Sequence, residues 1–129
     1  IESLPCFHGC ISKTECESLF RLKGTEGSYL IRESVTTPGA LCLCILHKTV
    51  LYTYRILKND RGYFIFKEIY FKSLMDLIAH YGKPGQGLVT QLCQPLKKNH
   101  IESQEIIFFC ARVTDRNYIS RNLMKLAGK

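Results

Sequence analysis

Apolar and polar residues alternate through the middle of the chain in the pattern typical of β-strands. Four strands are predicted there, over residues 27–34, 40–46, 50–57 and 62–66. Short stretches rich in Pro, Gly, Asn and Asp separate most of these runs, so we expect an antiparallel meander. A fifth, short strand is predicted over 88–92 and is ended by Pro95.

Helical spacing precedes and follows the meander. Ser12 and Glu15 form the S-x-x-E capping box of a helix N-terminus, and Gly24 predicts the end of that helix. Ser73 is the expected N-cap of a second helix. The apolar stripe of that helix, which we assign to core packing, consists of Leu74, Leu77, Ile78 and Tyr81. The order helix, strands, helix predicts an α+β fold with one helix on each side of a central antiparallel sheet.

Length and composition predict one folded domain. The chain has 129 residues, of which 46% are apolar and 22% are charged, as expected for a globular protein. Residues 99–129 do not continue the pattern of the preceding chain. We therefore expect residues 1–98 to form a monomeric domain and 99–129 to form a poorly ordered or weakly helical tail.

The sequence shows no transmembrane segment and no secretory signal. No apolar run approaches the ~20 residues that a spanning helix needs, and the first residues lack a basic segment followed by an apolar stretch. Seven cysteines without a C-x-x-C pair then indicate reduced thiols and a cytoplasmic location. A zinc site is the alternative interpretation of some of these cysteines. The spacing of its ligands matches no standard zinc finger, so we expect no metal and no cofactor. Its ligands would be Cys6, His8, Cys10 and Cys16.

The net charge of +7 favours an anionic partner such as phosphate, nucleic acid or an acidic lipid. Basic residues are spread along the chain and do not form a basic tail, so we expect no nucleic acid partner. Arg32 stands out because it shares a predicted strand face with Leu30. The residues that follow it, Ser34, Thr36 and Thr37, add hydroxyl and amide donors suited to a phosphate group.

Two further cations are candidates for this anion site. Lys13 lies in the first predicted helix and Arg55 in the third predicted strand. The alternative reading of Arg32 is an ordinary exposed arginine on an edge strand.

Signatures of catalysis are absent from the sequence. It contains no G-x-S-x-G, H-E-x-x-H, P-loop or G-x-G-x-x-G motif. His8 and His80 lie near the two predicted helices, where a lone histidine is usually structural. We therefore expect a binding module and not an enzyme.

Four stretches resemble the signature motifs of the Src-homology-2 (SH2) domain family. They are FHGCISKTECESLF, GSYLIRES, YTYRI and FKSLMDLIAHY, and they occur in the family's order over residues 5–95. The resemblance implies a central sheet flanked by two helices and a phosphotyrosine-binding activity. By matching motif positions, it implies phosphotyrosine contacts from Arg32, Ser34, Thr36, Thr37, Lys13, Arg55 and Cys42.

Two positions in these motifs depart from the family pattern. Thr53 stands where the family usually has a histidine, so the support beneath Arg32 differs. Lys13 stands where many members have an arginine, which keeps the charge but loses the planar fork.

Further stretches narrow the resemblance. PGALCLCI, YTYRI and KPGQGLV look like the small single-domain adaptors of the SLAM-associated-protein type. The SH2-containing inositol 5-phosphatases share similar stretches, so a fragment of such an enzyme is the alternative, and a phosphoinositide or membrane-surface binder is a second one. Chain length favours the adaptor over the phosphatase.

The adaptor resemblance implies partners and a second subsite. The partners would be tyrosine-phosphorylated tails of SLAM-family immune receptors that carry the motif T-x-Y-x-x-[VI]. The apolar residue after the tyrosine would be bound by Thr53, Tyr54, Ile65, Tyr81, Gly87 and Leu88, for which ordinary packing is the alternative. Lys72 matches an arginine that recruits the SH3 domain of a Src-family kinase, and Tyr118 is a candidate phosphorylation site in the tail.

Overall fold

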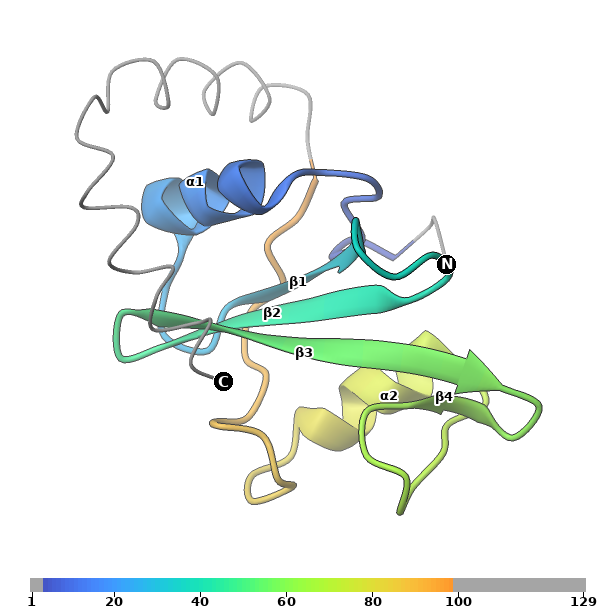
Figure 1. Cartoon of the computed structure of the whole chain (residues 1–129). Coiled ribbons are helices and arrows are strands. Elements are labelled where there is room, and N and C mark those ends of the chain that lie inside the picture. The colour runs from blue at the N-terminus through green and yellow to red at the C-terminus, as the bar shows by residue number, and fades with distance from the viewer. Residues whose placement is uncertain (1–3, 99–129) are drawn as a thin grey trace.

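In a computed structural model of the chain, residues 4–98 can be described. The elements, in chain order, are α1 (Lys13–Lys23), β1 (Tyr29–Glu33), β2 (Leu41–His47), β3 (Val50–Asn59), β4 (Gly62–Phe64) and α2 (Leu74–Tyr81). The strands form one antiparallel sheet in the order β1-β2-β3-β4, with α1 and α2 on opposite faces (Figure 1). The predicted α+β class, the meander and the two flanking helices are all confirmed.

The helix ends follow the predicted caps. Ser12 Oγ accepts the backbone N–H of Glu15 at 3.0 Å, and the Glu15 carboxylate accepts the backbone N–H of Ser12 at 3.0 Å. Such a reciprocal box satisfies two amide donors that a helix N-terminus leaves free. Gly24 closes α1 at its C-terminal end, and the Ser73 hydroxyl caps α2 by accepting from Asp76.

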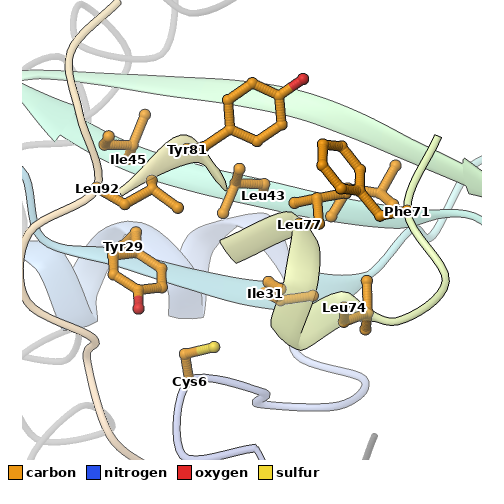
Figure 2. Packing of buried hydrophobic residues seen from close by; sticks show 11 residues of the cluster. Cys6, Tyr29, Ile31, Leu43, Ile45, Phe71, Leu74, Leu77, Tyr81 and Leu92 are labelled. Carbon is orange, nitrogen blue, oxygen red and sulfur yellow. The ribbon is translucent and has the colours of Figure 1, made fainter. Parts of the chain in front are cut away.

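Each face of the sheet has its own core. On the α2 face, Ile31, Leu43 and Leu77 are fully buried, and Figure 2 shows the side chains of α2 facing those of the strands. On the α1 face, helix residues pack against Leu30 of β1 and against Cys42 and Cys44 of β2. Period-two alternation therefore sorts each strand between two helices.

Two predictions about strands are wrong in part. The strand beginning at Gly62 ends at Phe64 and does not reach Phe66. No strand forms over 88–92. Instead, the segment 93–96 runs parallel to the start of β1, with hydrogen bonds from Cys93 to Gly27 and from Tyr29 to Gln94.

The outer edge of β1 is covered along its length. His8 N donates to the carbonyl of Ile31 at 2.8 Å, and Ile31 N donates to Cys6 at 2.8 Å, so the N-terminal segment follows one half of the strand. The segment 93–96 follows the other half. At Gly27, whose φ is +78°, a Cβ atom would lie 2.5 Å from Cys93 Sγ, so this approach requires glycine.

Between residues 4 and 98, neither helix is long and apolar enough to cross a membrane. The predicted tail over 99–129 lies outside the described residues, as does its tyrosine, Tyr118.

Candidate functional site

The candidate site begins with Arg32 in β1, which is only 5% exposed. In the register of the sheet, Arg32 pairs with Cys42 of β2, and Cys42 pairs with Arg55 of β3. Paired residues project from the same face, so the two arginines flank a cysteine on the face covered by α1. The alternative reading of Arg32 as an exposed edge residue is therefore wrong, because the covered edge of β1 and α1 bury it.

The loop between β1 and β2 places its hydroxyl groups beside these arginines. Ser34 Oγ accepts the backbone N–H of Thr37 at 3.1 Å and lies 3.4 Å from Thr36 Oγ1. Arg55 Nη2 donates to Thr36 Oγ1 at 3.4 Å. The structure thus brings Ser34, Thr36, Thr37 and Arg55 together, as the sequence predicts, although 21 positions separate Ser34 from Arg55.

The Arg32 guanidinium has unused capacity as a donor. Its Nε is buried and has no hydrogen-bond partner among the described residues, and Nη1 makes a long contact of 3.5 Å to the Glu33 carbonyl. Burial by itself would lower the pKa of Arg32, but the neighbouring thiols, with Cys44 foremost, outweigh it, and the pKa is raised. The group therefore remains a cation, and a buried cation with free donors is suited to a phosphate.

Helix α1 adds groups of both signs to the surroundings of Arg32. Lys13 is the first residue of the helix and is exposed. One turn later, Glu17 is 7% exposed and both carboxylate oxygens lack a hydrogen-bond partner within the described residues. Burial raises the pKa of Glu17 to about 7, against the opposing effect of Lys13, Arg21 and Arg32.

Glu17 was not among the residues expected at the site. From the sequence, Glu17 is an acidic residue in a predicted helix. Whether it lies near Arg32 of β1 depends on how that helix docks on the sheet. A signal was nevertheless present, because Glu17 lies four residues after Lys13, which places the two on one side of the helix.

A second group of candidate residues lies on the other side of β3. The hydroxyl of Tyr54 accepts the backbone N–H of Val89 at 3.0 Å. The ring of Tyr54 meets Phe66 edge-on, with 6.5 Å between centroids. Together with the half-buried Ile65 and Leu88, these residues form what we call the Tyr54 group: Tyr54, Ile65, Phe66, Leu88 and Val89.

Gly87 belongs beside the Tyr54 group. Its φ is +105°, and a Cβ atom there would lie 3.8 Å from Phe66. Phe66, which is 37% exposed, and Val89 were not expected at this position. The sequence predicts Phe66 as the last residue of a strand, whereas it lies in the loop beyond β4.

Of the residues expected with Tyr54, Thr53 lies on the other face of the sheet, and Tyr81 lies in the buried cluster against which Tyr54 packs. Thr53 pairs with Cys44 and lies on the α1 face, where its Oγ1 is 3.7 Å from Cys44 Sγ. Tyr81 is 1% exposed and packs edge-on against Phe71 in the core, where Figure 2 labels it. Alternation along β3 separates Thr53 from Tyr54, and the amphipathic face of α2 points Tyr81 inward.

The remaining candidates do not join either group. Lys72 is exposed and directly precedes the N-cap of α2. The zinc alternative is not formed, since no three His, Cys, Asp or Glu side chains gather as metal ligands within residues 4–98. His8, one of its proposed ligands, instead contacts the Leu96 carbonyl through Nε2 at 2.6 Å.

Comparison with known proteins agrees with this geometry. The sequence profile of the SH2 domain matches residues 6–81. SH2 domain-containing protein 1B2 of Mus musculus is 40% identical over 102 residues, covering 74% of this chain and 77% of that protein. SH2 domain-containing protein 1B of Homo sapiens is likewise 40% identical, covering 74% of this chain and 76% of its own length.

Enzymes also match, but only through a small part of their length. Phosphatidylinositol 3,4,5-trisphosphate 5-phosphatase 1 of Homo sapiens is 37% identical over 100 residues, which is 72% of this chain and 8% of the enzyme. The chain belongs to the SH2 domain family, whose members bind phosphotyrosine, and is similar to the small SH2 domain-containing proteins of the 1B type.

Proposed function

We propose that this protein is a cytoplasmic, non-enzymatic adaptor that binds phosphotyrosine at Arg32. The observation that carries the proposal is the buried guanidinium with an unpartnered Nε, set in one row with Arg55 and beside the hydroxyls of the β1–β2 loop. The +7 net charge supports the same conclusion, because it favours approach of an anionic ligand.

The chemistry of the ligand follows from depth and charge. Phosphotyrosine carries about −1.5 to −2 charges at neutral pH, whereas tyrosine carries none. An arginine that is 5% exposed is reached by a phosphate on a long aromatic side chain. Phosphoserine is too short to bring its phosphate to the same depth. In this proposal, Arg32 forms the principal ion pair, Ser34, Thr36 and Thr37 donate to phosphate oxygens, and Arg55, Lys13 and Cys42 line the ring.

The sequence preference is assigned to the Tyr54 group. Its half-buried aromatic and aliphatic side chains are suited to an apolar residue that follows the phosphotyrosine. The corresponding motif is T-x-Y-x-x-[VI], and the corresponding partners are tails of SLAM-family immune receptors. Lys72, exposed before α2, is the proposed contact for a Src-family kinase.

Titration calorimetry with the peptide motif T-I-Y-x-x-V, phosphorylated and unphosphorylated, tests this function. We expect the phosphorylated peptide to bind and Arg32→Ala to abolish most of that affinity. Removing one partner of a desolvated charge pair costs roughly 2–5 kcal/mol, a factor of about 30 to several thousand in Kd. Arg61→Ala is the matched control, because Arg61 stacks on Tyr70 outside the site. Equal affinity of the wild-type protein and Arg32→Ala would refute the proposal.

The same titration separates the alternatives. Binding of both peptide forms, with phosphorylation only tightening it, supports the SLAM-associated-protein type. Binding of the phosphorylated form alone favours a phosphatase-like SH2 domain. Binding of neither, together with adsorption to anionic liposomes that survives Arg32→Ala and weakens with salt, indicates a membrane-surface binder.

A further inference from the structure

The loop between β1 and β2 presents an exposed threonine beside the Arg32 site. Thr36 is exposed, and the preceding Val35 is 65% exposed. Further along the loop, a Cβ atom built on Gly39 would meet nothing within 4 Å, so the loop borders open space there. The tip of the loop therefore stands in solvent, where a modifying enzyme can reach it.

The hydroxyl oxygen of this threonine already contacts a cation. Arg55 Nη2 donates to Thr36 Oγ1 at 3.4 Å, and Ser34 Oγ lies 3.4 Å from the same oxygen. Arg55 belongs to β3, 19 positions further along the chain than Thr36. The pairing of the strands, and not proximity in sequence, thus places a guanidinium next to this exposed hydroxyl.

The nearest carboxylate in the sequence, that of Glu33, projects from the other face of the sheet. Glu33 pairs with Leu41, whose side chain packs against the core of the α2 face. The preceding residue, Arg32, pairs with Cys42, which belongs to the buried cluster of the α1 face. Because successive side chains of a strand alternate between faces, a negative charge on Thr36 meets Arg55 without Glu33 beside it.

A phosphate group on Thr36 fits this arrangement. Phosphothreonine carries about −1.5 to −2 charges at neutral pH and three strong acceptor oxygens. Once the phosphate is bonded to Oγ1, these oxygens surround the atom that Arg55 now contacts. A guanidinium can donate to two of them at once, which is its preferred geometry with phosphate.

We propose that Thr36 is a phosphorylation site, and that its phosphate pairs with Arg55 and closes the Arg32 site to phosphotyrosine. The closure rests on the function proposed above, whereas the modification and the pairing with Arg55 do not. The phosphorylated chain then carries its own competitor for the ligand.

The phosphate comes from ATP through a serine/threonine protein kinase. Thr36 Oγ1 attacks the γ-phosphorus of ATP, the bond from that phosphorus to the bridging oxygen breaks, and ADP leaves. The hydroxyl proton passes to the catalytic aspartate of the kinase. A protein phosphatase reverses the modification by transferring the phosphoryl group to water, which restores the hydroxyl.

Phosphorylation of Thr36 opposes phosphotyrosine binding in three ways. It replaces a hydroxyl that donates to the ligand by a group that only accepts, and it engages Arg55. It also adds a like charge, because Arg32 and Arg55 stand on either side of Cys42 in the sheet register and the two phosphates would share one row. Juxtaposed like charges suppress binding strongly, and a tethered group competes at a high effective concentration.

Phosphorus NMR tests the pairing without any peptide. Phosphothreonine is installed at position 36 of the full chain by nonsense suppression, and at Thr49 in the matched control. Thr49 is exposed in the turn at the opposite end of β2 from the Thr36 loop. We expect the pKa of the phosphate at position 36 to lie below the value of about 6 for a free phosphate ester, because a guanidinium favours the dianion. Arg55→Gln should raise this pKa again. Equal pKa values at positions 36 and 49, or no response to Arg55→Gln, overturn the pairing.

Phosphosite mapping tests whether cells modify this residue. The full chain is expressed in cells treated with an inhibitor of serine/threonine phosphatases, purified, and digested for mass spectrometry. We expect phosphate at Thr36, and its loss in Thr36→Val, which keeps the shape of the side chain and removes the hydroxyl. Phosphate at Thr37 alone, or at neither threonine, overturns the assignment.

Calorimetry with the phosphorylated T-I-Y-x-x-V peptide tests the closure. We expect phosphothreonine at position 36 to weaken binding by roughly a hundredfold, and a serine/threonine phosphatase to restore the original Kd. Phosphothreonine at position 49 adds the same charge at the other end of β2 and should leave the Kd unchanged. Equal Kd values for the two phosphorylated proteins overturn the closure. Failure of the unmodified protein to bind refutes the proposed function, while NMR still decides whether the phosphate pairs with Arg55.

Discussion

The two faces of the sheet use the same alternation of side chains for different purposes. On the α1 face, Arg32, Cys44 and Glu17 place charged and titratable groups inside a packed layer. On the α2 face, Leu43 and Leu77 form an apolar core that continues into the Tyr54 group. We infer that the α1 face recognises the charged group of the ligand, whereas the α2 face supplies stability and sequence preference.

Truncating the α2 core should give the largest effect on stability. Leu77 is 0% exposed, and a Leu→Ala change at such a position costs about 2–5 kcal/mol in the free energy of unfolding. Urea denaturation of Leu77→Ala measures this cost. Met75→Ala on the same helix is the control, because Met75 is 67% exposed and should change stability little. Similar losses in both variants would show that α2 does not carry the core.

Truncating Tyr54 should change sequence preference and leave phosphate binding in place. Tyr54→Ala removes the ring that meets Phe66 and leaves the Val89 N–H without its acceptor. We expect affinity for a phosphopeptide with an apolar residue after the tyrosine to fall about tenfold, while a peptide with alanine there changes little. Tyr54→Phe, which keeps the ring, should retain most of the preference. Equal losses for both peptides would assign Tyr54 to the shared part of the site.

Neutralising Glu17 should alter the pH dependence of binding. A bound phosphate favours the protonated form of Glu17, so affinity should fall as pH rises above about 7, the pKa of this carboxyl group. In calorimetry between about pH 6 and about pH 8, one unit on either side of that pKa, Glu17→Gln should bind severalfold more tightly than wild type at the upper end. Glu68→Gln, which changes an exposed carboxylate, should keep the wild-type profile.

Glu17→Gln has a second expected consequence. Because the folded state raises the pKa of Glu17, the ionised carboxylate opposes folding as pH rises from the unfolded pKa toward about 7. The variant should therefore gain Tm relative to wild type at pH 8 and lose that advantage near pH 4. An unchanged Tm difference across this range would show that Glu17 is not held in a buried environment.

The smallest effect is expected at the turn between β2 and β3. Glu26 accepts the Lys48 N–H at 2.9 Å and pairs with His47. The bond to Lys48 first, and then the one to His47, lowers the pKa of Glu26. Its stabilising effect is therefore present above the unfolded pKa near 4.5 and is lost as pH falls through the folded pKa. Thermal unfolding of Glu26→Gln should show a small Tm loss at pH 7 that disappears at low pH.

Local features were predictable because they depend on neighbours in sequence. The capping box at Ser12, the meander and the shared face of Leu30 and Arg32 follow from spacing and alternation alone. The loop between β1 and β2, with the hydroxyl groups of Ser34, Thr36 and Thr37, was predictable for the same reason. The predicted strand over 88–92 was wrong, because residues 93–96 pair with the start of β1 instead, and this pairing joins segments more than sixty residues apart.

The sequence by itself determined the elements, the two faces of each strand and the cation on one of them. The tertiary structure decided which side chains meet across those elements. Thr53 lies on the opposite face from Tyr54, while Phe66 and Val89 contact Tyr54. The placement of Cys16 and Cys44 in one buried cluster depends on how α1 docks on the sheet. Docking is set by packing of the whole layer, which no local pattern in the chain records.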